Sequence, residues 1–213
     1  MTPSQPTDRT IKMRVLVACE YSGTVRDAFR KKGHDAYSCD LLPTESDPAF
    51  HYQCDVKDVV GTGWDMMIAH PPCTYLCSSG LHWNRKFPER SQKTEEAVDF
   101  VKWLWSLPIN KIAIENPIGC LSTKIRKPDQ IIKPYQYGHD AAKSTCLWLK
   151  NLPPLKPTSY VEPKIIIYNG RKAKRWANQT PNGADKTSKG PDRWKTRSLT
   201  FQGIADAMAD QWG

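Results

Sequence analysis

The stretch "RVLVACEYSGTVRDAFRKKGH", residues 14–34, carries the turn from a strand into an amphipathic helix. Residues 14–18 are a β-branched and aliphatic run that predicts a buried strand. After the turn, Val25, Ala28 and Phe29 recur at helical spacing, and Gly33 ends the predicted helix. A strand that leads into a helix in this way is typical of a parallel βαβ unit.

The same alternation continues along the chain. Strands are predicted over residues 36–40, 64–70 and 111–117, with a weaker one over 50–56 and a helix over 94–107. We therefore expect a doubly wound, mostly parallel α/β sheet, in which ligands bind beyond the carboxyl ends of the strands.

The pattern changes after residue 117. One more strand is predicted over residues 146–150 and a closing helix over 203–212. Between them, residues 169–197 are rich in Gly, Asn, Lys and Arg and show little periodicity. This stretch is longer than an ordinary connection, so we expect either a functional loop or partial disorder.

The composition limits the class of protein. With 213 residues the chain suits one domain, and it contains no apolar run of membrane-spanning length. The polar start, residues 1–12, lacks a signal-peptide core and predicts a flexible tail on a cytoplasmic protein that makes no membrane contact. Seven scattered cysteines favour reduced thiols over a disulfide scaffold.

The net charge of +9 is concentrated in one late segment. Residues 156–197 contain 11 Lys and Arg but only 3 Asp and Glu. This concentration favours nucleic acid as the partner, with a solvated, disordered loop as the alternative. We expect DNA contacts from the basic residues Arg171, Lys172, Lys174, Arg175 and Arg193.

Chemistry-bearing residues follow successive predicted strands. Gly23 lies in the first strand-to-helix turn, where it would let a ligand approach the backbone. Asp40 ends the second strand, where a carboxylate suits ribose hydroxyls, and Asp55 could accept a hydrogen bond from an exocyclic amine. Together these positions predict a nucleoside pocket.

The segment "IAHPPCTYLCSSG", residues 68–80, places Cys73 after two prolines. Prolines stiffen a loop, and a rigid loop at a strand end suits a covalent nucleophile. Glu115 ends the next predicted strand, so both side chains would face one cleft. A thiolate opposite a carboxyl group is suited to conjugate addition to a pyrimidine at C6.

These motifs resemble those of the DNA (cytosine-5)-methyltransferase family in its small, phage-type form. "VACEYSGTVRDAF", "CDLLP" and "CDV" resemble the motifs that bind S-adenosylmethionine, and "PPCTYLC" and "ENP" resemble the catalytic ones. "AAKSTCLWL" stands in the place of the basic motif, and "SLTFQGIADAMADQW" resembles the last motif, which returns to the cofactor pocket.

The resemblance implies a Rossmann-like methyltransferase fold and a role for each matched residue. Cys73 would be the nucleophile, Glu115 would hold the cytosine, and Asn116 would shape that loop. Lys143 would replace an arginine that touches the base, and Pro72 would also lie on the substrate side. S-adenosylmethionine would contact Glu20, Ser22, Gly23, Asp40, Asp55 and Pro71.

The resemblance also sets the expected organisation. Residues 13–155 would form the catalytic and cofactor-binding domain, and residues 198–213 would return to it as a helix. The family's large target-recognition region is reduced here to residues 156–197, so a protein partner could supply sequence recognition.

Other interpretations fit parts of the pattern. His70, Cys73, Cys77 and His82 could bind zinc, although their spacing differs from that of a zinc knuckle, and we expect no metal. An amino-methyltransferase would need an aromatic ring in the place of Cys73. A non-catalytic binding protein, or the same chemistry on RNA or another base, also fits.

Overall fold

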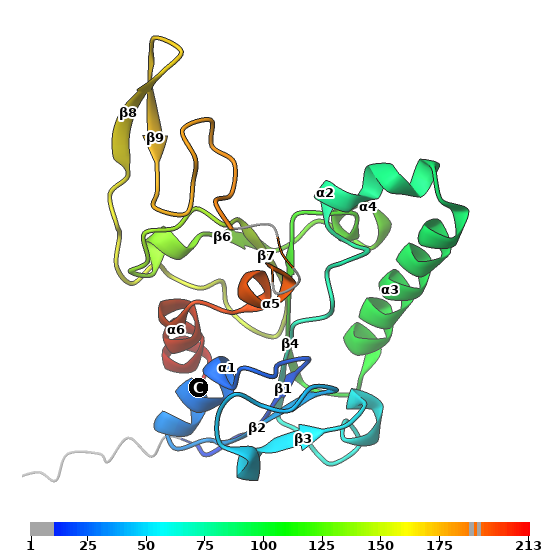
Figure 1. The fold of residues 1–213 in the computed structure, drawn as a ribbon. Coiled ribbons are helices and arrows are strands. Elements are labelled where there is room, and N and C mark those ends of the chain that lie inside the picture. Colours follow the sequence, from blue (N-terminus) through cyan, green and yellow to red (C-terminus); the bar gives the residue numbers. More distant parts are fainter. Residues whose placement is uncertain (1–10, 188–189, 191–192) are drawn as a thin grey trace, which may run out of the picture.

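A seven-stranded sheet forms the centre of the molecule (Figure 1). The computed structural model describes residues 11–187, 190 and 193–213; the predicted tail lies outside them except for Ile11 and Lys12. In spatial order the strands are β3 (His51–Gln53), β2 (Asp35–Asp40), β1 (Arg14–Ala18), β4 (Met66–Ala69), β5 (Lys111–Pro117), β7 (Thr145–Lys150) and β6 (Gln130–Ile132).

Five of these strands, from β3 to β5, pair in parallel, and β7 runs antiparallel between β5 and β6. The chain therefore has a doubly wound, mostly parallel α/β sheet, as the sequence predicted. The strand order turns back beside β1, where β2 lies on one side and β4 on the other. Ligands bind at such switch points in open α/β sheets.

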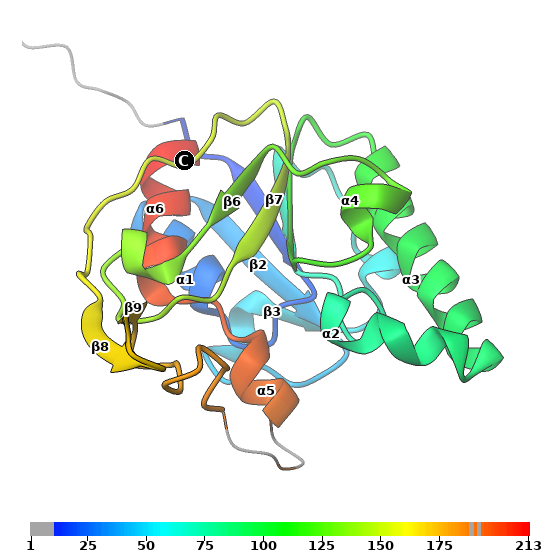
Figure 2. The ribbon, with the colours of Figure 1, turned by 90° about the horizontal axis from the view of Figure 1, so that it is seen from above.

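Helices cover both faces of the sheet (Figure 2). Alternate residues of β1 divide between the layers: Val15 and Val17 pack toward α1 and α6, whereas Leu16 and Ala18 pack toward α3. The helices are α1 (Thr24–Lys31), α2 (Ser78–Leu81), α3 (Pro88–Ser106), α4 (Leu121–Lys124), α5 (Arg193–Ser198) and α6 (Gln202–Trp212). Short 3-10 turns are η1 (Pro48–Phe50), η2 (Val56–Asp58), η3 (His82–Arg85) and η4 (Pro134–Gln136).

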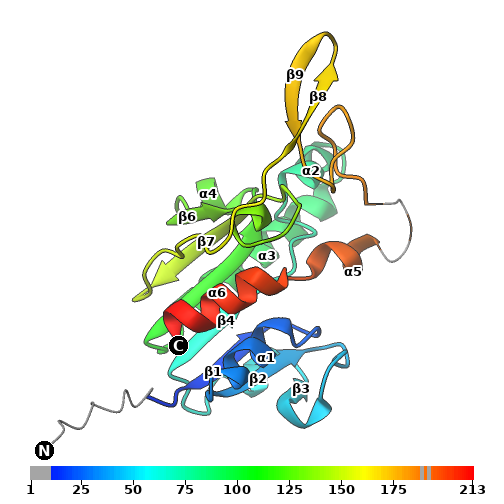
Figure 3. The ribbon, with the colours of Figure 1, turned by 90° about the vertical axis from the view of Figure 1, so that its left-hand side faces the viewer.

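The basic segment contains regular structure that the sequence analysis does not predict. Strands β8 (Lys164–Tyr168) and β9 (Arg171–Arg175) form an antiparallel hairpin that projects from the body (Figure 3). Asn169 and Gly170 connect them with φ angles of 49° and 73°, the conformation that an Asn-Gly hairpin turn requires. The sequence analysis, which expected a functional loop or partial disorder over residues 169–197, did not predict this hairpin; the Asn-Gly signal at residues 169 and 170 outweighs the weak alternation of the flanking runs.

Two further elements differ from the sequence prediction. The three residues of β6 are too few to show periodicity, so that strand was missed. Helix α3 begins at Pro88, earlier than residue 94, because proline is well accommodated in the first turn of a helix. Among the described residues, no helix combines the length and the apolar character needed to cross a membrane.

The loop after β4 packs tightly against the segment that follows β5. Cys77 and Gly119 form an isolated antiparallel bridge, and Cys120 donates its backbone N–H to the Leu76 carbonyl at 2.9 Å. A Cβ added at Gly119 would lie 1.9 Å from the carbonyl oxygen of Leu76. Only glycine lets the two segments approach this closely.

We expect Gly119→Ala to lower the free energy of unfolding by about 1–3 kcal/mol, because the new methyl group must displace backbone. Urea denaturation followed by circular dichroism measures the change. Gly61→Ala is the control, since a Cβ there meets no heavy atom within 4 Å. Equal stability of the two variants would contradict the tight packing of these loops.

Candidate active site

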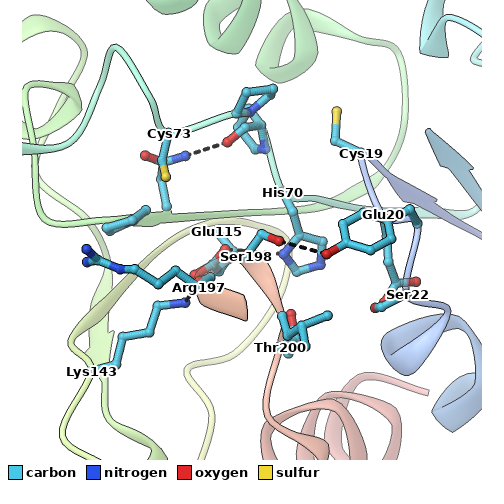
Figure 4. Close-up of a pocket in the computed structure, with 16 residues that line it drawn as sticks. Cys19, Glu20, Ser22, His70, Cys73, Glu115, Lys143, Arg197, Ser198 and Thr200 are labelled. Atoms are coloured by element: carbon cyan, nitrogen blue, oxygen red, sulfur yellow. Dashed lines mark hydrogen bonds and ion pairs between the residues drawn. The ribbon is translucent and has the colours of Figure 1, made fainter. Parts of the chain in front are cut away.

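A pocket opens beyond the carboxyl ends of β1, β4 and β5 (Figure 4). It brings together the turn after β1, the Pro-Pro-Cys loop after β4, the end of β5 and a segment next to α6. The lining residues are Cys19, Glu20, Tyr21, Ser22, His70, Pro71, Pro72, Cys73, Glu115, Asn116, Pro117, Lys143, Arg197, Ser198, Leu199 and Thr200.

Helix α3 holds the loop that carries Cys73. Arg90 donates to the Thr74 carbonyl at 2.9 Å, and the buried Thr94 donates its hydroxyl to the Tyr75 carbonyl at 3.0 Å. From β5, Asn116 donates its amide N–H to the Pro71 carbonyl at 2.8 Å. Hydrogen bonds from two elements therefore position Cys73, as a preorganised reactive group requires.

Glu115 forms a buried pair with His70. His70 Nδ1 lies 3.2 Å from Glu115 Oε2, and the two side chains are only 9% and 17% exposed. Burial acts to raise the pKa of Glu115, but the His70 hydrogen bond and the charge of Lys143 outweigh it and hold that pKa low. Burial acts to lower the pKa of His70, and Glu115 and then Glu20 raise it above its usual value. The sequence analysis considered His70 only as a possible zinc ligand and missed this contact.

Two thiols line the pocket, and their surroundings differ. Burial and the carboxylates of Asp40 and Asp55 raise the pKa of Cys19 to about 12. Burial, Cys77 and Glu115 also raise the pKa of Cys73, but the positive charge of Lys143 opposes this shift. Because the thiolate is the nucleophile, the cation near Cys73 favours it over Cys19.

A second cavity continues the pocket on the side of β2. Cys19 and Pro72 line both spaces, and the second one also contains Asp40, Asp55, Val56 and Phe100. The walls of this cavity combine carboxylates with apolar side chains. Asp40 Oδ1 accepts the Leu42 N–H at 2.9 Å and Asp55 Oδ1 accepts the Lys57 N–H at 3.0 Å. A nucleoside, with ribose hydroxyls and a flat base, has the chemistry that such walls accept.

The other predicted cofactor residues mainly shape the turn after β1. Glu20 accepts the Val25 N–H at 2.7 Å and the Arg26 N–H at 3.2 Å, so its carboxylate lies at the first turn of α1. Burial raises the pKa of Glu20. Ser22 lines the pocket, whereas Gly23 does not; Gly23 has a φ of 75° and begins the helix.

The C-terminal segment supplies pocket residues that the sequence analysis did not single out. Lys143 donates its ammonium group to the Arg197 carbonyl at 2.7 Å, and Tyr21 Oη lies 3.1 Å from Ser198 Oγ. Lys143 was predicted to lie near the substrate. The resemblance of "SLTFQGIADAMADQW" to a motif that returns to the cofactor pocket was the available signal for this segment, but it pointed to no single side chain.

The basic residues predicted to bind DNA are not among the residues that line this pocket; they lie on the hairpin and at the start of α5. Lys172 pairs with Ile167 and Lys174 with Ile165, so these four side chains share one exposed face of the hairpin. Arg171 is also exposed. By contrast, Arg175 donates to the Pro181 carbonyl at 2.9 Å, and Arg193 donates to the Thr187 carbonyl.

The side chains considered for other chemistry have separate partners. Cys77 Sγ lies 3.3 Å from Ser79 Oγ, and His82 packs on Trp83 rather than on His70 or Cys73. The described part of the chain contains no group of three His, Cys, Asp or Glu residues placed to hold a metal. Tyr75, the ring nearest to an amino-methyltransferase pattern, packs under Arg90 and does not line the pocket.

Comparisons with known proteins identify no family for this chain. No family model matches the chain, and no curated protein matches its sequence. A similar solved structure is a chain from E. coli provisionally described as a DNA modification methyltransferase encoded within a prophage. The two chains are 16% identical, with a TM-score of 0.44 over 65% of this chain and 46% of that one. The present chain thus spans less than half of that protein, and a similarity of this size shows no shared activity.

The His70–Glu115 pair should make stability depend on pH. Folding lowers the pKa of Glu115 below 4.5 and raises the pKa of His70 above 6.5. The Glu115 contribution is complete above pH 4.5 and is lost as pH falls through its folded pKa. The His70 contribution is complete below pH 6.5 and is lost as pH rises through its folded pKa.

We therefore expect Glu115→Gln to lower the free energy of unfolding by about 2 kcal/mol between pH 4.5 and 6.5, and by less as pH rises further. Urea unfolding at a series of pH values measures the difference from the unmodified protein. Glu95→Gln is the control, because Glu95 is exposed and forms a surface ion pair with Lys124. A loss for Glu115→Gln that stayed constant up to about pH 9 would argue against an ion pair.

Proposed function

We propose that this protein transfers a methyl group from S-adenosylmethionine to C5 of cytosine in DNA. The observation that carries the proposal is the presence of Cys73 and Glu115 in one pocket, on neighbouring parallel strand ends, next to a cavity lined by Asp40 and Asp55. The fold and the motif resemblance support the reaction class, and the thiol–carboxylate pair supports C5 as the acceptor atom.

Cys73 would start the reaction by adding to C6 of the cytosine. Its Sγ–H proton leaves to solvent, the Sγ–C6 bond forms, and the electron pair of the C5–C6 double bond shifts through C4 to N3, which takes up a proton. Glu115 would hold the N3 side of the ring and stabilise this added proton. C5 would then be nucleophilic toward the methyl group that the cofactor supplies. After C5 carries the methyl group, loss of the C5 proton to solvent would restore the C5–C6 double bond, break the Sγ–C6 bond and free Cys73 as a thiolate, and N3 would give back its added proton.

The residues around the two cavities fit the cofactor. Asp40 would hold the ribose, Asp55 the adenine amine, and the turn of Glu20 and Ser22 the methionine part. The buried Nε2 atom of His70, which has no hydrogen-bond partner among the described residues, leaves a polar position for a ligand beside that turn. When bound, S-adenosylmethionine supplies an electrophilic methyl group.

DNA would bind across the carboxyl edge of the sheet and along the basic hairpin. The target cytosine lies inside a duplex stack, so it must swing out to reach a pocket that is lined by buried side chains. Lys172 and Lys174, on the exposed hairpin face, would contact phosphates, and Lys143 would approach the base. A protein partner that adds sequence recognition is part of this proposal.

Incubation with labelled S-adenosylmethionine and mixed-sequence DNA tests the reaction. We expect label in 5-methylcytosine and a covalent complex with DNA that contains 5-fluorocytosine. Cys73→Ala should abolish both, because the adduct needs this thiol. Cys77→Ala is the matched control, since Cys77 lies on the same loop but outside the pocket lining, and it should retain trapping.

Label on an exocyclic nitrogen would replace the proposal with an amino-methyltransferase. Label in RNA but not in DNA would change the substrate. Cofactor binding without any methylation would indicate a non-catalytic relative, and unchanged trapping by Cys73→Ala would place the nucleophile elsewhere.

A binding experiment tests the hairpin separately. Replacing Lys172 and Lys174 by Ala should weaken DNA binding and reduce the slope of log Kd against log salt by about 2, because two phosphate contacts are lost. Fluorescence anisotropy over a salt series measures both quantities. Replacing Lys12 and Lys31 by Ala is the control of equal charge. Both residues are exposed and precede β1 and β2, at the amino ends of these strands and so opposite the carboxyl edge. Equal slopes for the two double variants would make the hairpin a solvated surface only.

A further inference from the structure

His70 has two ring nitrogens with different surroundings. Nδ1 contacts Glu115, as described above, whereas Nε2 is buried and has no hydrogen-bond partner among the described residues. A buried ring nitrogen without a partner destabilises the protein unless something else satisfies it. Because His70 lines the pocket, a ligand can supply that partner.

The position of the ring indicates which ligand this would be. Figure 4 shows the His70 imidazole between Glu115 on one side and the Glu20–Ser22 turn on the other. The two nitrogens of an imidazole point in divergent directions, so Nε2 faces away from Glu115 and toward the turn assigned above to the methionine part of the cofactor. One ring therefore spans both halves of the pocket.

Charged and titratable groups reach this ring from several elements. Glu20 follows β1, Cys73 lies on the same loop as His70, Lys143 precedes β7, and Arg197 is in α5. Glu115 and Glu20 favour a charged imidazole, whereas Lys143 disfavours it. A second carboxylate placed at Nε2 would favour the imidazolium further, since both ring nitrogens would then donate.

We propose that His70 is a positioning residue that couples the cofactor half of the pocket to the protonation of Glu115. The inference rests on the proposed function, which identifies the ligand at Nε2 as the amino-acid end of S-adenosylmethionine. With Nε2–H donated to the cofactor carboxylate, Nδ1–H is donated to Glu115 Oε2. When N3 of the cytosine takes up its proton, the Nδ1 proton of the imidazolium passes to the Glu115 carboxylate and Glu115 passes a proton on to N3, so that Glu115 ends as a carboxylate again and His70 becomes neutral.

Two substitutions separate the two nitrogens. The amide nitrogen of Asn occupies roughly the place of Nδ1, and that of Gln roughly the place of Nε2. Isothermal titration with S-adenosylhomocysteine should therefore show about tenfold weaker binding for His70→Asn and less than about threefold for His70→Gln. Thermal unfolding of each variant reports whether the fold is retained.

The pH dependence of trapping on 5-fluorocytosine DNA tests the proton transfer. An amide nitrogen cannot release a proton as an imidazolium does, so at saturating cofactor both variants should lose trapping at lower pH than the unmodified protein. The two variants should therefore differ in cofactor affinity but share this shift of the pH profile.

Each outcome decides between coupling and a purely structural role. Equal cofactor affinities for the two variants, or pH profiles identical to that of the unmodified protein, would overturn the coupling. Cofactor binding without trapping in the unmodified protein would refute the proposed methylation, while the titration would still decide whether Nε2 meets the cofactor. Absence of cofactor binding in the unmodified protein would refute both.

Discussion

The parallel pairing of β1, β4 and β5 is the constraint on which the rest of the structure depends. The register places Ala18 beside Ala69 and Ala69 beside Ile114, so β1 and β4 end at one level, and β5 continues for three residues beyond it to Pro117. The His70 backbone N–H extends the ladder by donating to the Ala18 carbonyl at 2.9 Å. Residues that follow each strand therefore meet at one edge, and both faces are covered by helices, which leaves this edge for a ligand.

At that edge, burial makes each charge depend on its neighbours. Glu20 is held by two backbone N–H groups, and Glu115 is held by His70 with Lys143 nearby. A buried carboxylate without such partners would take up a proton instead. The pocket thus combines an ionised acid, an imidazole and a thiol. His70 Nε2 and Asn116 Oδ1 remain buried without hydrogen-bond partners among the described residues, and both lie where a ligand would bind.

The late part of the chain contributes both to the pocket and to the surface proposed to bind DNA. The segment from Arg197 to Thr200 lines the pocket, and α6 then packs on α1 in the apolar layer below. The contact between Lys143 and the Arg197 carbonyl joins this segment to the loop before β7. The hairpin of β8 and β9 comes before this segment in the chain, so the proposed DNA-binding surface and part of the pocket lining belong to one late region of the sequence.

Local patterns were sufficient to predict the strand-helix alternation, the strand ends and the convergence of Cys73 with Glu115, because periodicity and strand length are properties of short stretches. They were insufficient for β6, which is too short, and the Asn-Gly turn of the hairpin was a local signal that was overlooked. Tertiary structure alone decided that His70 pairs with Glu115 and that Arg197 and Ser198 reach the pocket. The His70–Glu115 contact joins residues 45 positions apart and the Tyr21–Ser198 contact joins residues 177 positions apart, and only the packing of the sheet and its helices sets the distance between them.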